Sequence, residues 1–189
     1  MRSADPPDER RTRFEQLYAA NHDPVLTYLL RRTSSRDDAA DVLAETFLTA
    51  WRRLDDVPED EQARPWLYGV ARRSLANHRR GEGRRTALAD RLRGELAKAG
   101  ALTPDRAISS TAAEAFEELP ERDRELLALV AWEGLDTAEV AVVLGCSRNA
   151  VRIRLHRARA RFERLLHART NQQQRRAEGF TPAMKEVSR

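Results

Sequence analysis

Residues Thr137–Phe162 have the sequence TAEVAVVLGCSRNAVRIRLHRARARF, and this segment decides the fold class of the chain. Asp136 precedes it and Glu139 follows three residues later, the spacing of a helix N-cap and its capping-box partner. Gly145 then interrupts the apolar pattern, and Ser147 offers a second N-cap. The segment therefore predicts two helices joined by a tight turn, a helix-turn-helix.

The second of these helices is apolar on one side and strongly basic on the other. Its apolar residues recur at steps of four and three, the spacing of one buried face: Val151, Leu155, Ala158, Phe162 and Leu165. Against one acidic residue, Glu163, the same helix carries eight arginines: Arg148, Arg152, Arg154, Arg157, Arg159, Arg161, Arg164 and Arg169. This pattern is typical of a helix that lies in the major groove of DNA.

Composition indicates a charge-rich helical protein. The 189 residues are 41% hydrophobic and 34% charged, enough for one medium domain or two small ones. Few segments alternate with period two, so we predict an all-α fold of two small helical domains joined by a flexible linker. All but two of the 34 basic residues are arginine, which suits phosphates and guanine edges, but a genomic codon bias explains the count equally well.

Cys146 is the only cysteine, so we expect neither an intrachain disulfide nor a cysteine-based metal cluster. It falls in the predicted turn, where a small buried residue is the simplest interpretation and redox sensing is not expected. Apolar runs stay well below membrane-spanning length. We therefore expect a cytoplasmic protein with no cofactor, no metal site and no catalytic residues.

The N-terminal half begins with a polar lead, residues 1–9, for which we predict flexibility. A first helix follows from about Phe14, and Asp23 with Pro24 is predicted to start a second one as N-cap and first helical residue. These positions carry no recognisable chemistry and are interpreted as core.

The next predicted helix, Ser35 to Leu54, carries an acidic stripe beside a broad apolar face. Asp37, Asp41 and Glu45 recur every four residues. Like charges at this spacing repel each other, so the stripe costs stability unless a basic partner meets it. A solvated helix face and a docking surface for a basic partner both fit the pattern.

The predicted helix from Ala63 to Arg80 mixes an aromatic side chain with cations. One face carries Trp66, Val70, Arg73, Asn77 and Arg80 at steps of four and three. Such interleaving suits unstacked single-stranded bases, although Trp66 as an ordinary core residue fits equally well. Gly81 and Gly83 are predicted to end this helix, and residues 84–111 are predicted to form the linker.

Four segments in this order resemble bacterial RNA polymerase sigma factors, specifically the extracytoplasmic-function group of the sigma-70 family. They are DAADVLAETFLTAW at Asp38–Trp51, PWLYGVA at Pro65–Ala71, LPERDREL at Leu119–Leu126, and the helix-turn-helix. The resemblance covers roughly residues 12–85 and 112–168. It implies sigma region 2 over residues 10–83, region 4 over residues 112–168, and a tail at residues 169–189 that we predict to be disordered.

The resemblance also implies the function. A sigma factor directs core RNA polymerase to promoters by recognising the −35 and −10 elements and stabilising the melted −10 strand, without catalysis of its own. Implied partners are core RNA polymerase, promoter DNA and an anti-sigma factor, with no small-molecule substrate. A stand-alone helix-turn-helix regulator that binds duplex DNA as a dimer is the alternative, but it leaves residues 10–83 without a role. A recombinase would need a catalytic N-terminal site that the helical pattern does not supply.

Three sets of residues carry the implied contacts. Docking on a basic coiled coil of the largest polymerase subunit is expected from Asp37, Asp38, Asp41, Glu45 and Phe47. Recognition and melting of the −10 element are expected from Arg64, Trp66, Arg73, Asn77 and Arg80. Recognition of the −35 element is expected from Arg148, Asn149, Arg152, Ile153, His156 and Arg157.

Two positions depart from the family pattern. Many members carry Asn and, four residues later, Asp in the −10 helix, where this chain has Arg73 and Asn77. A small polar residue often stands at the place of Ile153, which instead suits an apolar contact with a thymine methyl group. The promoter sequence therefore does not carry over from the family.

Overall fold

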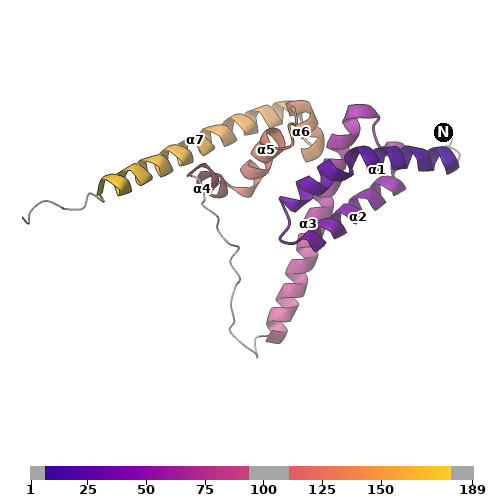
Figure 1. Ribbon diagram of the computed structural model, residues 1–189, viewed down its shortest axis with the longest axis horizontal. Helices are drawn as coiled ribbons and strands as arrows, with labels where there is room; N and C mark the ends of the chain where they lie inside the picture. The colour runs from indigo at the N-terminus through magenta and orange to yellow at the C-terminus, as the bar shows by residue number, and fades with distance from the viewer. Residues whose placement is uncertain (1–6, 94–110, 180–189) are drawn as a thin grey trace, which may run out of the picture.

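Every regular element in the described residues, 7–93 and 111–179, is a helix, as the all-α prediction requires (Figure 1). The computed structural model contains, in this part of the chain, α1 (Pro7–Leu30), α2 (Arg36–Arg52), η1 (Leu54–Asp56), η2 (Asp60–Gln62), α3 (Ala63–Arg93), α4 (Thr111–Glu117), α5 (Glu121–Ala131), α6 (Thr137–Leu144) and α7 (Arg148–Gly179). Helices α1, α2 and α3 pack into a first unit, and α4 to α7 pack into a second.

Helix α1 crosses the point where we predicted a break. The prediction that Asp23 and Pro24 start a new helix is wrong, because α1 continues through both residues to Leu30. Pro24 removes one backbone donor, but Tyr28 and Leu29 in the following turn are completely buried. This packing outweighs the lost hydrogen bond. Of the predicted flexible lead, residues 7–9 are helical, and residues 1–6 lie outside the described residues.

Helix α2 begins where the sequence predicted. Its N-cap is Ser35, whose Oγ accepts a hydrogen bond from the Asp38 backbone N–H at 3.0 Å. The predicted apolar face is confirmed by the buried residues Ala39, Val42, Leu43, Thr46, Phe47 and Ala50. Trp51, in the last turn of α2, is 38% exposed.

Helix α3 is longer than predicted. The prediction that Gly81 and Gly83 end it is wrong, since the helix continues to Arg93. A glycine inside a helix costs only about 1 kcal/mol relative to alanine, which the surrounding helical turns can absorb. Residues 84–93 of the predicted linker therefore belong to α3, and residues 94–110 lie outside the described residues.

The helix-turn-helix forms as its sequence predicts. Asp136 and Glu139 make a complete capping box at the start of α6. Gly145 ends α6 in the left-handed conformation, with φ 62°, which glycine adopts without steric cost. The Ser147 Oγ accepts a hydrogen bond from the Ala150 backbone N–H at 3.2 Å and caps α7.

Helix α7 extends beyond the predicted second domain. The prediction of a disordered tail is wrong for residues 169–179, which continue the helix, while residues 180–189 lie outside the described residues. The extension is held by α4: Arg169 pairs with Glu114 at 2.7 Å and with Glu118. Thr111 Oγ1 also donates to Gln173 Oε1 at 2.7 Å.

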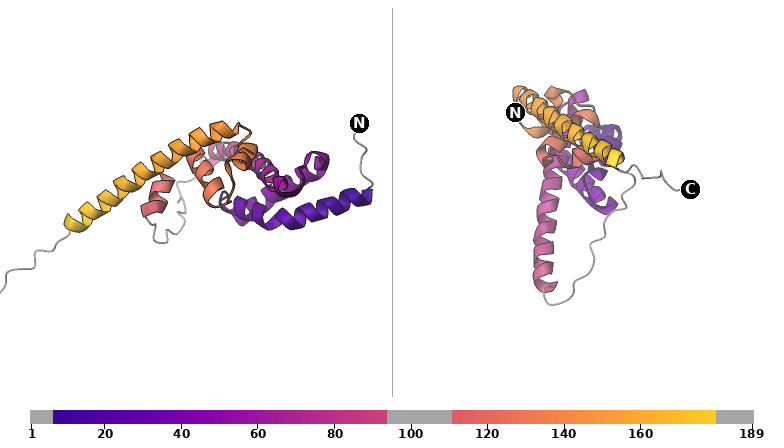
Figure 2. Two further views of the ribbon diagram at one scale, coloured as in Figure 1. Left: turned by 90° about the horizontal axis from the view of Figure 1, so that it is seen from above. Right: turned by 90° about the vertical axis from the view of Figure 1, so that its left-hand side faces the viewer.

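The two units contact each other through α3 and α6, and one hydrophobic cluster runs through both of them (Figure 1). At Gly69 of α3, an added Cβ would lie 3.5 Å from the Val143 carbonyl oxygen of α6, so the two backbones approach closely. Figure 2 shows α3 and α7 extending away from this junction in different directions. Within the described residues, none of the helices has the length and apolar character that crossing a membrane requires.

Candidate functional site

Helix α7 presents the predicted basic face to solvent. On its other face, Val151, Leu155 and Ala158 are buried, where α7 packs on the other helices of the second unit. All six residues predicted for −35 recognition are exposed on the other side: Arg148, Asn149, Arg152, Ile153, His156 and Arg157. Ile153 is 46% exposed, so its apolar side chain lies open on the same face as the arginines.

The arginines of α7 divide into two groups. Arg161 pairs with Asp123 and Arg169 pairs with Glu114 and Glu118, so these two hold the second unit together. Within the part of the chain that the structure describes, Arg152, Arg154 and Arg157 engage in no ion pair or side-chain hydrogen bond. Arginines that no carboxylate of the described residues holds are available to bind an anion such as a DNA phosphate, and these include the exposed Arg148 and Arg159 as well. The sequence alone did not separate the two groups, because the acidic partners of Arg161 and Arg169 lie outside α7.

The predicted stripe of α3 is only partly continuous. Arg73, Asn77 and Arg80 are exposed, and an Arg80 Nη2–H donates to the Asn77 Oδ1. Val70, which the spacing placed among them, is only 2% exposed. Val70 therefore interrupts the stripe and separates Trp66 from its polar members.

Trp66 is partly a core residue and partly exposed. Its ring packs against the small cluster of Leu54, Val57 and Ala63, and it remains partly exposed. The Arg53 guanidinium lies 5.8 Å from the ring centroid, a cation–π distance. Arg64, the remaining residue of the predicted −10 set, is exposed and its Nε–H donates to Asn21 Oδ1 at 3.5 Å.

The acidic stripe of α2 lies open to solvent. Asp37, Asp41 and Glu45 are exposed, and among the described residues no cation pairs with them. Leu48, three residues after Glu45, is also exposed and extends the stripe with an apolar side chain. Sequence reasoning missed Leu48, although its spacing from Asp41 and Glu45 places it on the same helix face.

Two members of the predicted docking set serve the fold instead. Phe47 is 4% exposed and packs edge-to-face against Phe14, with ring centroids 6.4 Å apart. The Asp38 carboxylate accepts from Ser35 Oγ at 2.7 Å and lies 3.2 Å from His78 Nε2 on α3. The Ser35 hydrogen bond, helped by His78, lowers the pKa of Asp38. Phe47 is therefore a core residue, and Asp38 is engaged inside the first unit with 21% of its side chain exposed.

Comparison with known proteins identifies both units. The family models "Sigma-70 region 2" and "Sigma-70, region 4" match residues 17–85 and 111–162. The RNA polymerase sigma-H factor of Pseudomonas aeruginosa is 30% identical over 165 residues, which cover 81% of this chain and 86% of that protein. The chain belongs to the sigma-70 family. Within that family it is an extracytoplasmic-function sigma factor.

Other relatives agree with this assignment. CnrH of Cupriavidus metallidurans is 34% identical over 143 residues, 69% of this chain and 74% of that protein. The extracytoplasmic-function sigma factor SigM of Bacillus subtilis is 26% identical over 160 residues, 84% of this chain and 98% of that protein. A solved structure of CnrH in complex with the cytosolic domain of CnrY superposes with a TM-score of 0.55 at 29% identity, covering 82% of this chain and 88% of that one.

The sigma factor thus directs RNA polymerase to promoters through regions 2 and 4 and is not itself an enzyme. Helices α1 to α3 form region 2, and α4 to α7 form region 4. The stand-alone helix-turn-helix alternative is wrong, because region 2 occupies the N-terminal half that this alternative left without a role. Within the described residues, no three His, Cys, Asp or Glu side chains are grouped to hold a metal ion.

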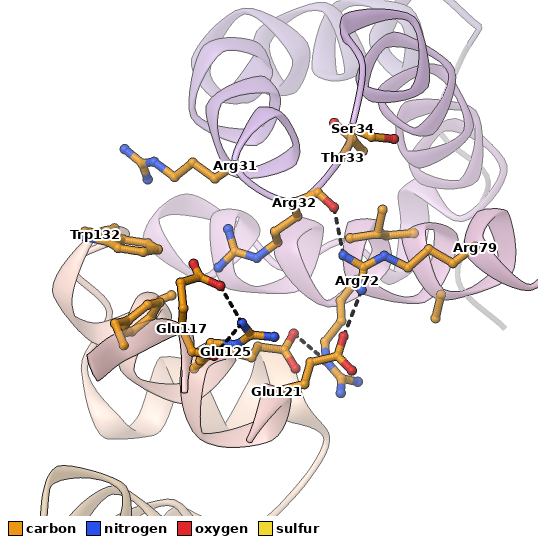
Figure 3. Close-up of a pocket in the computed structure, with 15 residues that line it drawn as sticks. Arg31, Arg32, Thr33, Ser34, Arg72, Arg79, Glu117, Glu121, Glu125 and Trp132 are labelled. Atoms are coloured by element: carbon orange, nitrogen blue, oxygen red, sulfur yellow. Dashed lines mark hydrogen bonds and ion pairs between the residues drawn. The ribbon is translucent and has the colours of Figure 1, made fainter. Parts of the chain in front are cut away.

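Regions 2 and 4 meet across a cavity of about 530 Å³ that is rich in charge (Figure 3). Region 2 contributes Arg31, Arg32, Arg72 and Arg79 to its wall, and region 4 contributes Glu117, Glu121, Glu125 and Arg124. Burial in this region raises the pKa of Tyr28 to about 12. Sequence reasoning missed the charged residues of this interface, because their partners lie about 40 to 100 residues away.

Proposed function

We propose that three exposed surfaces of this sigma factor divide the work of promoter selection. The acidic stripe of Asp37, Asp41 and Glu45, extended by Leu48, docks on the basic coiled coil of the largest polymerase subunit. The polar end of the α3 stripe, with Arg64 and Trp66, binds the melted −10 strand. The exposed face of α7 reads the −35 element as duplex DNA.

The observation that carries this proposal is the separation of charge between helices. The three carboxylates of the stripe stand exposed on α2 without a cation of their own among the described residues. Basic residues that the fold does not use stand on α3 and α7, including Arg73, Arg152 and Arg157. A protein that only bound DNA would gain nothing from an uncompensated acidic stripe, because it repels phosphates.

Two contacts follow for promoter choice. Arg73 and Asn77 in the −10 helix replace the Asn and Asp that many family members carry, so we expect a −10 element of different sequence. Ile153 stands exposed among the base-reading residues and is suited to a thymine methyl group in the −35 element.

We further propose that the sigma factor acts in the cytoplasm, where it meets core polymerase, and that an anti-sigma protein controls it. The complex of CnrH with the cytosolic domain of CnrY supports this, since it shows a related sigma factor bound by another protein.

The test adds the purified protein to sigma-free core polymerase and measures initiation on a genomic promoter library. We expect transcripts that start at a common promoter sequence. Asp41→Arg combined with Glu45→Arg should weaken polymerase binding roughly 100-fold or more, because attraction becomes repulsion. Glu59→Arg with Glu61→Arg is the matched control, since both are exposed, lie off the stripe and change charge equally. Equal polymerase binding by the two double variants would refute the docking assignment.

A further inference from the structure

We propose that the N-terminal half of α1 positions the −10 surface, with Arg10 and Arg13 as the positioning residues. Neither arginine contacts DNA in this proposal; both act through the backbone segment that lies beside Trp66. The inference rests on the proposed role of Arg64 and Trp66 in binding the melted −10 strand. Both arginines precede residue 17, where the sigma-70 region 2 match begins, so the family comparison assigns them no role.

One face of α1 is turned toward the connecting segment between α2 and α3, residues 53–62. Of residues 8–21, all but five are exposed. The five follow the i, i+3, i+4, i+7, i+11 spacing of a single helix face: Arg10, Arg13, Phe14, Leu17 and Asn21. Two of them are cations, which a purely apolar core would not contain.

The two arginines hold the backbone at the end of α2 and in the connecting segment. An Arg10 Nη2–H donates to the Trp51 carbonyl, one of the last carbonyls of α2, at 2.9 Å. Arg10 Nη1 also pairs with Asp55 at 2.8 Å. An Arg13 Nη2–H donates to the Val57 carbonyl at 2.9 Å. The start and the middle of the segment are thus fixed by a helix that lies 41 to 45 residues earlier in the chain.

The same face of α1 also contacts the −10 surface itself. Trp66 packs on the small cluster of the connecting segment, and Phe14 and Leu17 pack on that cluster from α1. Asn21 Oδ1 accepts the hydrogen bond from Arg64 Nε at 3.5 Å. Helix α1 therefore supports both the aromatic ring and the cation that we assign to the melted strand.

The connecting segment is held in a conformation that costs energy. Asp60 has a left-handed backbone, with φ 51°, which residues other than glycine adopt at a cost. Such a conformation persists only where the surrounding contacts fix it. The hydrogen bonds from Arg10 and Arg13 are contacts of this kind, and charged donors make them stronger than neutral ones. A segment fixed in advance beside Trp66 can bind a melted strand without the entropy loss of ordering a loop.

Arg10→Met combined with Arg13→Met tests the positioning role, because methionine keeps an unbranched apolar side chain and removes the donors. Initiation with core polymerase is measured on a promoter from the library and on copies with a scrambled −10 or −35 element. We expect the preference for the intact −10 element to fall roughly tenfold, since the binding-competent segment is populated less. The preference for the intact −35 element should not change.

A loss of folded protein would lower initiation on all three promoters by the same factor and leave both preferences unchanged. The matched control is Arg11→Met with Arg122→Met, since both arginines are exposed and Arg11 pairs only with Glu15 on its own helix. Arg10→Lys with Arg13→Lys restores one donor at each position and should recover part of the −10 preference. A −10 preference equal to that of the wild type in the methionine variant would overturn the proposal.

Hydrogen exchange of the free full-length protein gives a test that needs no polymerase. Peptides covering residues 53–62 should exchange roughly tenfold faster in the methionine variant than in the wild type or the control, because bonds from charged donors are lost. Unchanged exchange would overturn the positioning role even if initiation fell. A wild type without any −10 preference would instead refute the proposed function, and exchange would still decide whether α1 fixes the segment.

Discussion

Helices α3 and α7 both have an apolar face and a polar face with arginines, but they differ in how many of the predicted polar-face residues are exposed. On α7, all six residues predicted to face DNA are exposed. On α3, Val70 in the middle of the predicted stripe is buried and only Arg73, Asn77 and Arg80 form a continuous polar end. Helix α7 packs within its own region, whereas α3 packs against helices of its own region and also against α6 of region 4. A helical period reveals one buried face but not a second one supplied by a distant segment.

The largest effect is expected from removing exposed arginines of α7. Arg152→Ala with Arg157→Ala removes two exposed arginines that the described fold does not use. Each base contact of this kind contributes about 1–3 kcal/mol, so initiation that depends on the −35 element should fall roughly 100-fold. The free energy of unfolding should stay within about 0.5 kcal/mol of the wild type. Quantitative in vitro transcription and urea denaturation measure the two quantities.

The control for this prediction is Arg164→Ala on the same helix. Arg164 is exposed but lies beyond the region 4 match, and its Nε–H donates only to the Ala160 carbonyl in the preceding turn. It should leave initiation nearly unchanged. If Arg164→Ala alone reduced initiation as much as the double variant, the position of the arginine on α7 would not matter and the face assignment would fail.

The helix-turn-helix could be predicted almost completely from the sequence, because its signals are local. Asp136, Glu139 and Gly145 act within a few residues of each other, and the structure contains the capping box and the left-handed turn that they predict. The breaks predicted at Pro24 and Gly81 fail for the opposite reason. Each residue weakens a helix locally, but α1 and α3 continue through them, and α1 is held by burial against the rest of region 2.

Contacts between residues far apart in the sequence also limited how well the candidate sites could be predicted. Asp38 and Phe47 have the residue types expected of a docking surface, but His78 and Phe14 on other helices engage them. The ion pairs of the arginines at the region 2–region 4 interface could not be predicted either, since a charged residue on a helix does not indicate its partner on another helix. Periodicity predicts which side of a helix is polar, and only the tertiary structure shows which polar residues remain free.

A smaller effect is expected from the residue that breaks the α3 stripe. Val70→Ala should lower the free energy of unfolding by about 2 kcal/mol, because it removes buried methyl groups and leaves a cavity. Val142→Ala is the control, since Val142 on α6 is exposed and its truncation should cost less than about 0.5 kcal/mol. Urea denaturation of both full-length variants makes the comparison. Equal losses would show that Val70 is no more buried in solution than a surface residue, and that the α3 stripe is as open as that of α7.

The smallest effect concerns α6, the helix that contacts both α3 and α7. Hydrogen bonds from the Glu139 and Ala138 backbone N–H groups lower the pKa of Asp136 below its ordinary value of 3.8. Because the folded-state pKa is the lower one, this stabilisation is present above about pH 4 and is lost as the pH falls through the folded value. Asp136→Asn keeps a capping oxygen but cannot titrate, so its melting temperature should depend less on pH below pH 4. Asp136→Ala should melt at a lower temperature than Asp136→Asn at every pH. Identical acid dependence in the wild type and Asp136→Asn would show that ionisation of Asp136 does not contribute to stability.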